Sequence, residues 1–301
     1  MYIASNHYRL TFLFCLFWVC VSWGSCYLFI ELALHSFPPF FLTSVRLGVA
    51  GFLLWNLLWL MGYRHWPALA DLRRAFTTAF FMSVLSAGVM TVGQQHVPSG
   101  TVAIVMGSIP LWMVLAGWLF LGENPPSRRQ GLGLLLGTCS VVLLGVRQGA
   151  VGVGAAFGML CLALNIGGWV AGSIYAKKHA HDTKLSALQS TALMLMAGGL
   201  ELLLCSLFMG ESVAFQDVTV LGWGSVAVLI LFGGIVAYAC YFWLLANTST
   251  SLAVAYEYVN PAVGMILGWL VTGESIDAVK ITICIAIAVA LFCVVTGNRR
   301  V

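Results

Sequence analysis

Long apolar runs separated by short polar segments dominate the chain between residues 10 and 296. Each run holds roughly 17 to 25 mostly apolar residues, the length that an α-helix needs to cross the hydrocarbon core of a bilayer. The runs lie near residues 10–33, 39–61, 75–94, 98–121, 129–146, 152–176, 185–208, 222–245, 250–272 and 277–296. The pattern therefore predicts an all-α integral membrane protein with ten transmembrane helices.

Composition supports this class and argues against the alternatives. Hydrophobic residues make up 61% of the chain and charged residues 8%, and the mean hydropathy is +0.97. A soluble domain of this length would carry far more charge. The strands of a membrane β-barrel alternate apolar and polar positions, whereas these runs are continuously rich in Leu, Val, Ala and Gly. A helical bundle is the expected architecture.

Basic residues are divided unevenly between the two sides that ten spans would create. Those in the termini and the even-numbered loops are Arg9, Arg64, Arg73, Arg74, Arg128, Arg129, Lys177, Lys178, Lys184, Arg299 and Arg300. The opposite side holds only Arg147 and Lys280. Because Lys and Arg concentrate in cytoplasmic loops, both termini are predicted to be cytoplasmic. Orientation thus explains the net charge of +4, without a nucleic-acid partner.

Two segments about 151 residues apart repeat the same motif. The first contains Ile109-Pro110, Gly117-Trp118-Leu119 and Gly122-Glu123, and the second contains Asn260-Pro261, Gly268-Trp269-Leu270 and Gly273-Glu274. The chain is therefore interpreted as a duplication, with a first repeat at 1–148 and a second at 149–301. Each repeat has an odd number of spans, five, so the second enters the membrane from the opposite side. Inverted repeats are typical of transporters that place a central substrate cavity between the two halves.

Further short motifs fit the same register and indicate a family. Trp23-Gly24-Ser25 lies in the first span, and Val97-Pro98-Ser99-Gly100 opens the fourth. Together with the repeated motif, their order and spacing resemble the EamA-type family of the drug/metabolite transporter superfamily over nearly the whole chain. The resemblance implies a ten-helix carrier of the bacterial inner membrane, often an exporter of amino acids or other small metabolites.

Helical spacing predicts which side chains line the cavity, because residues three or four apart share one face of a helix. Five spans carry polar and aromatic residues at such spacings. The predicted substrate-binding residues are Trp23, Tyr27, Arg46, Thr91, Gln94, Asn165, Trp169, Tyr238, Tyr241, Tyr256, Glu257 and Asn260. For any one of them the alternative is an ordinary hydrogen bond between helices or an aromatic residue at the membrane interface.

Ionisable residues within the spans indicate the site more sharply. Inserting each at mid-depth of the membrane costs roughly 2.5–3.5 kcal/mol, so each needs a partner or water. Arg46 either pairs with Glu31 or binds a substrate carboxylate through its planar guanidinium. Glu257 is expected to bind a cationic group of the substrate or a coupling proton, and Glu201 is a second candidate for proton coupling. The alternative for Glu257 is a hydrogen bond to a neighbouring helix.

Two prolines at equivalent places in the repeats are candidates for helix breaks or gates. Pro261 cannot donate a hydrogen bond to the carbonyl of Glu257 and so loosens that turn. Pro110 is its counterpart in the first repeat.

Three functional classes follow from these features. The first is a secondary carrier, most favourably an exporter of amino acids or related amphipathic compounds, with proton coupling through Glu257 or Glu201. The second is a carrier of organic cations, held by an aromatic cage of Trp169, Tyr238, Tyr241 and Tyr256. The third, a membrane enzyme or channel, is the weakest, since the sequence shows no catalytic triad, phosphate-binding loop or ring of like charge.

The remaining expectations concern partners. All nine cysteines fall within the spans and lack the spacing of metal ligands, so neither a metal nor another cofactor is expected. The expected partners are a small-molecule substrate and the lipid bilayer, and the chain is expected to act as a monomer or a weak homodimer.

Overall fold

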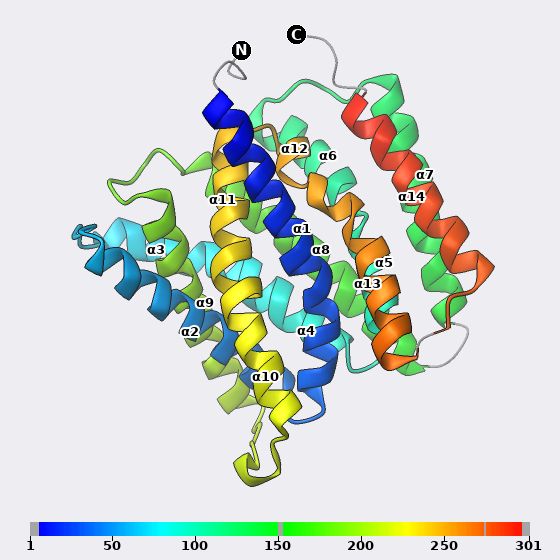
Figure 1. The fold of residues 1–301 in the computed structure, drawn as a ribbon. Coiled ribbons are helices and arrows are strands. Elements are labelled where there is room, and N and C mark those ends of the chain that lie inside the picture. Colours follow the sequence, from blue (N-terminus) through cyan, green and yellow to red (C-terminus); the bar gives the residue numbers. More distant parts are fainter. Residues whose placement is uncertain (1–5, 150–152, 274, 297–301) are drawn as a thin grey trace.

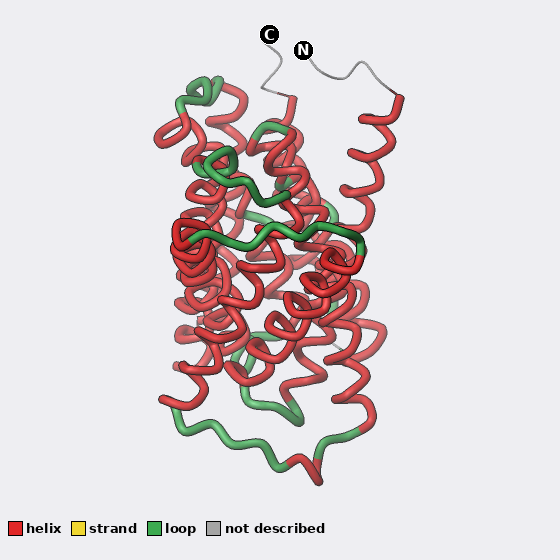
Figure 2. Tube along the Cα trace, turned by 90° about the vertical axis from the view of Figure 1, so that its left-hand side faces the viewer, coloured by secondary structure: helices red, strands yellow, loops and turns green. Residues whose placement is uncertain are grey.

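The computed structural model describes residues 6–149, 153–273 and 275–296, and every regular element in these ranges is helical. The tube in Figure 2 shows the helices joined by short loops. In chain order the elements are α1 (Asn6–Leu34), α2 (Pro39–Leu60), α3 (Leu69–Ala79), η1 (Phe80–Gly88), α4 (Val89–Gly93), α5 (Ser99–Met106), α6 (Ile109–Leu121), α7 (Arg128–Gly149), α8 (Val153–Lys178), α9 (Ala187–Phe208), η2 (Phe215–Asp217), α10 (Val220–Val228), η3 (Leu229–Val236), α11 (Ala237–Asn247), α12 (Thr250–Ala253), η4 (Ala255–Tyr258), α13 (Asn260–Leu267), η5 (Gly268–Thr272) and α14 (Ala278–Thr296). Glu274 of the repeated motif lies outside the described residues.

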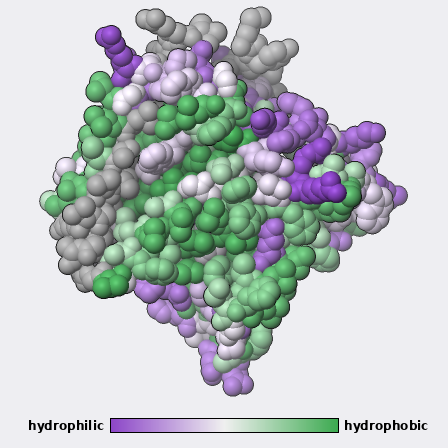
Figure 3. Space-filling model, turned by 180° about the vertical axis from the view of Figure 1, so that it is seen from behind, coloured by the Kyte–Doolittle hydropathy of each residue, from purple (hydrophilic) through white to green (hydrophobic). Residues whose placement is uncertain are grey.

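Seven helical segments of the described chain are long and apolar enough to cross a membrane. They are Tyr8–Leu34, Pro39–Leu60, Leu69–Gly93, Ser99–Leu121, Val153–Lys178, Ala187–Phe208 and Val220–Asn247. The other predicted spans, 129–146, 250–272 and 277–296, coincide with α7, with the segment from α12 to η5, and with α14. Hydrophobic side chains form a broad belt on the face shown in Figure 3, as a lipid-facing surface requires.

The bundle has two distinct ends. α1 begins and α14 ends at the same one, which we call the terminal end (Figure 1). The hydroxyl of Tyr8, near the start of α1, donates to the carbonyl of Asn247, at the end of α11, over 2.6 Å and joins two helices there. The opposite end, where α1 leads into α2, we call the distal end.

Helices of corresponding spans in the two repeats pack against each other: α2 of the second predicted span against α9 of the seventh, α7 of the fifth against α14 of the tenth, and α5 of the fourth against α13 of the ninth. The α2–α9 crossing is closest at Gly48 and Gly199. A Cβ added to Gly199 would collide with the backbone of Gly48. The absence of side chains here lets the two backbones approach closely, as small residues do between membrane helices.

The two repeats also share irregular helical segments. The π-helical segments η1 and η3 interrupt the third and eighth predicted spans at equivalent places. A break at Gly107 and Ser108 separates α5 from α6, and the residues from Val254 to Val259 separate α12 from α13. Each break is followed by a proline, Pro110 or Pro261, as the second residue of the next helix. Proline fits this place because its missing N–H falls among the unsatisfied donors of a first helical turn. The role of these prolines in breaking the helices or in gating stays a prediction.

Candidate functional site

A small cavity lies among helices of both repeats. Its volume is about 60 Å³, far below the roughly 300–1,000 Å³ of an ordinary small-molecule pocket. Its walls come from α1, α2, η1, α4, α5, α6, α8, α11 and η4. The lining residues are Trp23, Cys26, Tyr27, Arg46, Ser86, Ala87, Met90, Met106, Ile109, Asn165, Trp169, Tyr238, Tyr256 and Glu257. We call this space the central cavity.

Eight of the twelve side chains predicted to bind substrate line the central cavity: Trp23, Tyr27, Arg46, Asn165, Trp169, Tyr238, Tyr256 and Glu257. The sequence reading missed the small and apolar part of the wall, which includes Cys26, Met90, Met106 and Ile109. Nothing in the sequence distinguishes such residues from the other hydrophobic residues, which make up 61% of the chain. Ser86 was also missed, although its place in the π-helical segment η1 marks it, because π-helical turns are frequent at functional sites.

Thr91 and Gln94 lie outside the wall and bond to neighbouring groups. The hydroxyl of Thr43 donates to that of Thr91 over 3.0 Å, and Thr91 itself donates to the carbonyl of Ala87. The amide of Gln94 donates to the carbonyl of Tyr27 over 3.0 Å. Both side chains therefore link helices, which is the alternative that the sequence left open.

Tyr241 and Asn260 stand directly behind the wall. The hydroxyl of Tyr241 lies 2.6 Å from that of Ser173, and its ring packs against Trp23 and Trp169. The amide of Asn260 donates to the Oε2 atom of Glu257 over 3.2 Å. These two residues support the side chains that line the cavity.

Two ionisable side chains of opposite sign line the cavity and are not paired with each other. Arg46 is 6% exposed and Glu257 is 3% exposed. Within the described residues Nε of Arg46 has no hydrogen-bond partner, and neither does Oδ1 of Asn165 on the same wall. A buried polar atom without a partner costs about 1–3 kcal/mol, so these atoms are suited to meet water or a bound molecule.

The alternative pairing of Arg46 with Glu31 is not formed. Oε2 of Glu31 instead accepts from the backbone N–H of Ser99 over 3.1 Å, at the start of α5 and the distal end of the bundle. Glu31 lies near the end of α1. The N–H groups in the first turn of α5 lack partners within that helix, and their partial positive charge attracts the carboxylate of Glu31.

Trp23 occupies the centre of an aromatic cluster. Its ring centroid lies 5.1 Å from Trp169, 5.2 Å from Tyr238, 5.4 Å from Tyr241 and 5.0 Å from Tyr256. The indole N–H donates to the carbonyl of Gly233 in η3 over 3.1 Å, which fixes the ring. The predicted cation cage is therefore assembled around an indole, and a cation would have to displace Trp23.

Glu201, the second predicted proton site, lies on α9 away from the central cavity. Its Oε2 has no hydrogen-bond partner within the described residues. The geometry therefore separates it from Glu257.

Two further cavities lie toward the ends of the bundle. One of about 530 Å³ at the distal end is lined by Glu31, Leu34, His35 and residues 94–98. The other, of about 290 Å³, lies toward the terminal end between α3, α8, α9 and α11, with Arg74, Tyr175, His179 and Phe242 in its wall. Both are larger than the central cavity, which is closed to a ligand of ordinary size in this conformation.

No group of three or more His, Cys, Asp or Glu side chains suited to a metal ion occurs within the described residues.

Comparison with known proteins adds the family. The profile of the EamA-like transporter family matches residues 10–146 and, a second time, residues 156–296. The chain is 30% identical to the "Uncharacterized inner membrane transporter YedA" of Escherichia coli K12 over 93% of this chain and 88% of that protein. It is 24% identical to the "Uncharacterized transporter YoaV" of Bacillus subtilis, over 91% of each chain. It is also 25% identical to the WAT1-related protein At3g02690 of Arabidopsis thaliana, over 90% of this chain and 66% of that protein.

A solved crystal structure shares the fold, with a TM-score of 0.70 at 19% identity over 97% of this chain and all of the other. The double match of the profile spans the helices that build the central cavity. This multi-pass membrane protein belongs to the EamA-like transporter family of the drug/metabolite transporter superfamily.

Proposed function

We propose that the chain is a secondary transporter of small amphipathic metabolites, most favourably an exporter of amino acids or related zwitterions. Ten membrane helices in two inverted repeats, 1–148 and 149–301, would expose the central cavity alternately to the two sides. The proposed location is the bacterial inner membrane with both termini in the cytoplasm. Two observations support this placement. Lys and Arg are distributed unevenly between the two sides, and the relative YedA is named as an inner membrane transporter.

The observation that carries the proposal is the unpaired opposite charges of the central cavity. Arg46 offers a planar guanidinium that matches a carboxylate, and Glu257 offers a carboxylate that matches an ammonium group. Buried charges without a counter-ion are costly in a membrane. Their presence on one wall therefore favours a substrate that carries both complementary charges. The aromatic and Met side chains of the wall suit its apolar part.

Transport requires movement of the wall, since about 60 Å³ is far below the roughly 300–1,000 Å³ of an ordinary small-molecule pocket. Trp23 is the side chain that fills the centre, and its displacement would enlarge the site. Glu257 would also carry a coupling proton, because it touches the cavity and Glu201 does not.

Counterflow in proteoliposomes tests the proposal. Vesicles preloaded with an unlabelled zwitterionic amino acid should accumulate the labelled form, with a pH gradient and without one. Arg46→Lys keeps the charge and loses the planar fork, so the apparent affinity for zwitterions should fall about tenfold or more. Uptake of zwitterions at wild-type affinity by Arg46→Lys would contradict the role of this residue. No exchange of any zwitterion would contradict the substrate class.

The second candidate is a carrier of organic cations, favoured by the aromatic rings beside Glu257. The ring centroids of Tyr241 and Tyr256 lie 6.1 Å apart, and both rings pack against Trp23. A cation–π contact between a ring face and a quaternary ammonium group contributes about 0.5–2 kcal/mol to binding. Counterflow of a labelled quaternary amine, unchanged in Arg46→Lys and lost in Glu257→Gln, would favour this candidate over the first.

A further inference from the structure

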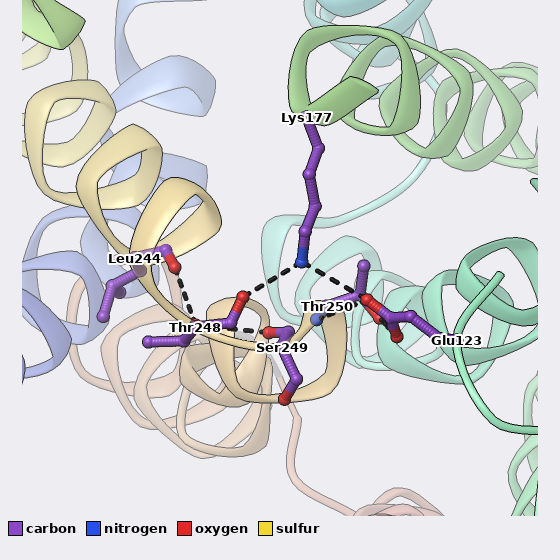
Figure 4. A network of polar contacts seen from close by, with 6 residues as sticks. All are labelled: Glu123, Lys177, Leu244, Thr248, Ser249 and Thr250. Carbon is purple, nitrogen blue, oxygen red and sulfur yellow. Dashed lines mark hydrogen bonds and ion pairs between the residues drawn. The ribbon is translucent and has the colours of Figure 1, made fainter. Parts of the chain in front are cut away.

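A hydrogen-bonded ion pair joins three separate segments at the terminal end (Figure 4). Nζ of Lys177, in the last turn of α8, lies 3.3 Å from Oε1 of Glu123, which directly follows the end of α6. Oε2 of Glu123 accepts from the hydroxyl of Thr250 over 2.7 Å, at the start of α12. Lys177 also donates to the carbonyl of Thr248 over 3.0 Å. The carboxylate belongs to the first repeat, whereas Lys177, Thr248 and Thr250 belong to the second.

The repeated sequence motif builds this contact. Gly122 ends α6 in the left-handed conformation, with φ of 69°, and the backbone N–H of Glu123 returns to the carbonyl of Gly117 over 3.2 Å. The side chain of Glu123 thereby folds back over Gly117. A Cβ added there would lie 2.7 Å from Oε2 of Glu123 and 2.8 Å from the hydroxyl of Thr250. A Cβ there would push the carboxylate and the hydroxyl away from their present places, so the motif's two glycines and its glutamate act together.

Lys177 also connects the two helix ends that bound the terminal-end cavity of about 290 Å³. Tyr175 and Ala176 line that cavity just before Lys177, and Ala246 lines it just before Thr248. The hydrogen bond from Lys177 to Thr248 holds the ends of α8 and α11 together. Separation of these ends would open the bundle toward the terminal side.

We propose that Glu123, Lys177 and Thr250 form a latch that keeps the terminal end closed and must break for the central cavity to open on that side. The latch rests on the alternating access proposed above. Lys177 is 21% exposed and Glu123 is 31% exposed, so water competes for both. A contact of this kind is weak enough to break in each transport cycle.

Chemical labelling tests the latch without any substrate. Cys26 lines the central cavity, and a variant that keeps it alone among the nine cysteines reports access to that space. A membrane-impermeant methanethiosulfonate reagent is applied from either side of oriented proteoliposomes. Glu123→Gln and Lys177→Met should each raise the labelling rate of Cys26 from the terminal side by about threefold to tenfold, the range expected for the loss of a partly exposed charged contact. Labelling from the distal side should fall.

Two kinds of control keep the test decisive. Lys177→Arg retains the charge and should label like the wild type. Lys178→Met removes the exposed neighbour of Lys177, which has no ion pair within the described residues, and should change nothing. Equal labelling rates in all variants, including none from either side, would overturn the latch. Counterflow that fails while labelling shifts as expected would instead contradict the proposed substrate class.

Discussion

The two ends of the bundle are closed by contacts of different chemistry. At the terminal end the carboxylate of Glu123 binds both Lys177 and Thr250 and so joins the two repeats. At the distal end the carboxylate of Glu31 accepts from the backbone of Ser99 within its own repeat, without a cation among the described residues, beside a cavity of about 530 Å³. The described residues thus close the terminal end with an ion pair between the repeats and the distal end with hydrogen bonds from backbone N–H groups to carboxylates, since Glu211 also accepts from Phe40 and Phe41 there.

This difference shows how a duplicated chain becomes asymmetric. Equivalent helices begin at Ser99 and Thr250, and a glutamate side chain bonds to the backbone N–H of each. The glutamates come from different elements, α1 and the residue after α6, and only Glu123 has a lysine beside it. Under the proposed alternating access, a lysine beside one of these two glutamates and not beside the other would change the relative stability of the two closed states and so the side that the cavity faces.

The largest effect is expected between the two ends, at Trp23. Trp23→Ala removes an indole that contacts four other rings and should lower the free energy of unfolding by about 3–5 kcal/mol. It should also enlarge the cavity, so that Cys26 becomes reachable from the distal side at a higher rate. Apparent melting temperature in detergent and labelling rates measure the two effects. Trp23→Phe, which keeps a ring, is the matched control, and equal stability of the two variants would contradict the packing role.

Helices, the duplication and most of the central cavity were predictable, because apolar runs and polar stripes leave direct signals in the sequence. Trp23, Arg46 and Glu257 were found in this way. The position of Trp23 within the cation cage was not, since ring packing depends on how α1, α8 and α11 cross. The partners of Glu31 and Glu123 were also missed. Each lies more than 50 residues away along the chain, beyond the reach of helical periodicity.

The next effect is expected at the terminal end itself, at Gly117. Gly117→Ala places a Cβ against Glu123 and Thr250 and should destabilise the closed terminal end by about 1–3 kcal/mol through overpacking. Labelling of Cys26 from the terminal side should rise at least fivefold. Gly131→Ala is the control, because a Cβ there meets nothing within 4 Å. If Gly117→Ala labels like Gly131→Ala, the glycine has no part in closing this end.

A smaller effect is expected at the distal end. Glu31→Gln keeps an acceptor for the N–H of Ser99 and loses only the charge, so it should cost less than the roughly 0.5–1.5 kcal/mol that a whole hydrogen bond contributes. Ser99 also has other contacts, so Glu31 does not hold it alone. Labelling of Cys26 from the distal side should rise no more than about threefold. An increase larger than that of Gly117→Ala from its own side would reverse the proposed order of the two ends.

The smallest effect, a response to salt, separates the charge of the latch from its hydrogen bonds. At about 1 M salt the Debye length falls to about 3 Å, comparable to the separation of Lys177 and Glu123, so the ion pair is screened while the bond from Thr250 persists. Terminal-side labelling of Cys26 should rise by less than about twofold, which corresponds to about 0.4 kcal/mol, a part of the roughly 0.2–1 kcal/mol that an exposed ion pair contributes. Lys177→Met already lacks the ion pair and should show no response. A response of equal size in that variant would mean that salt acts elsewhere, and the stronger closure of the terminal end would then depend on Thr250 rather than on the lysine.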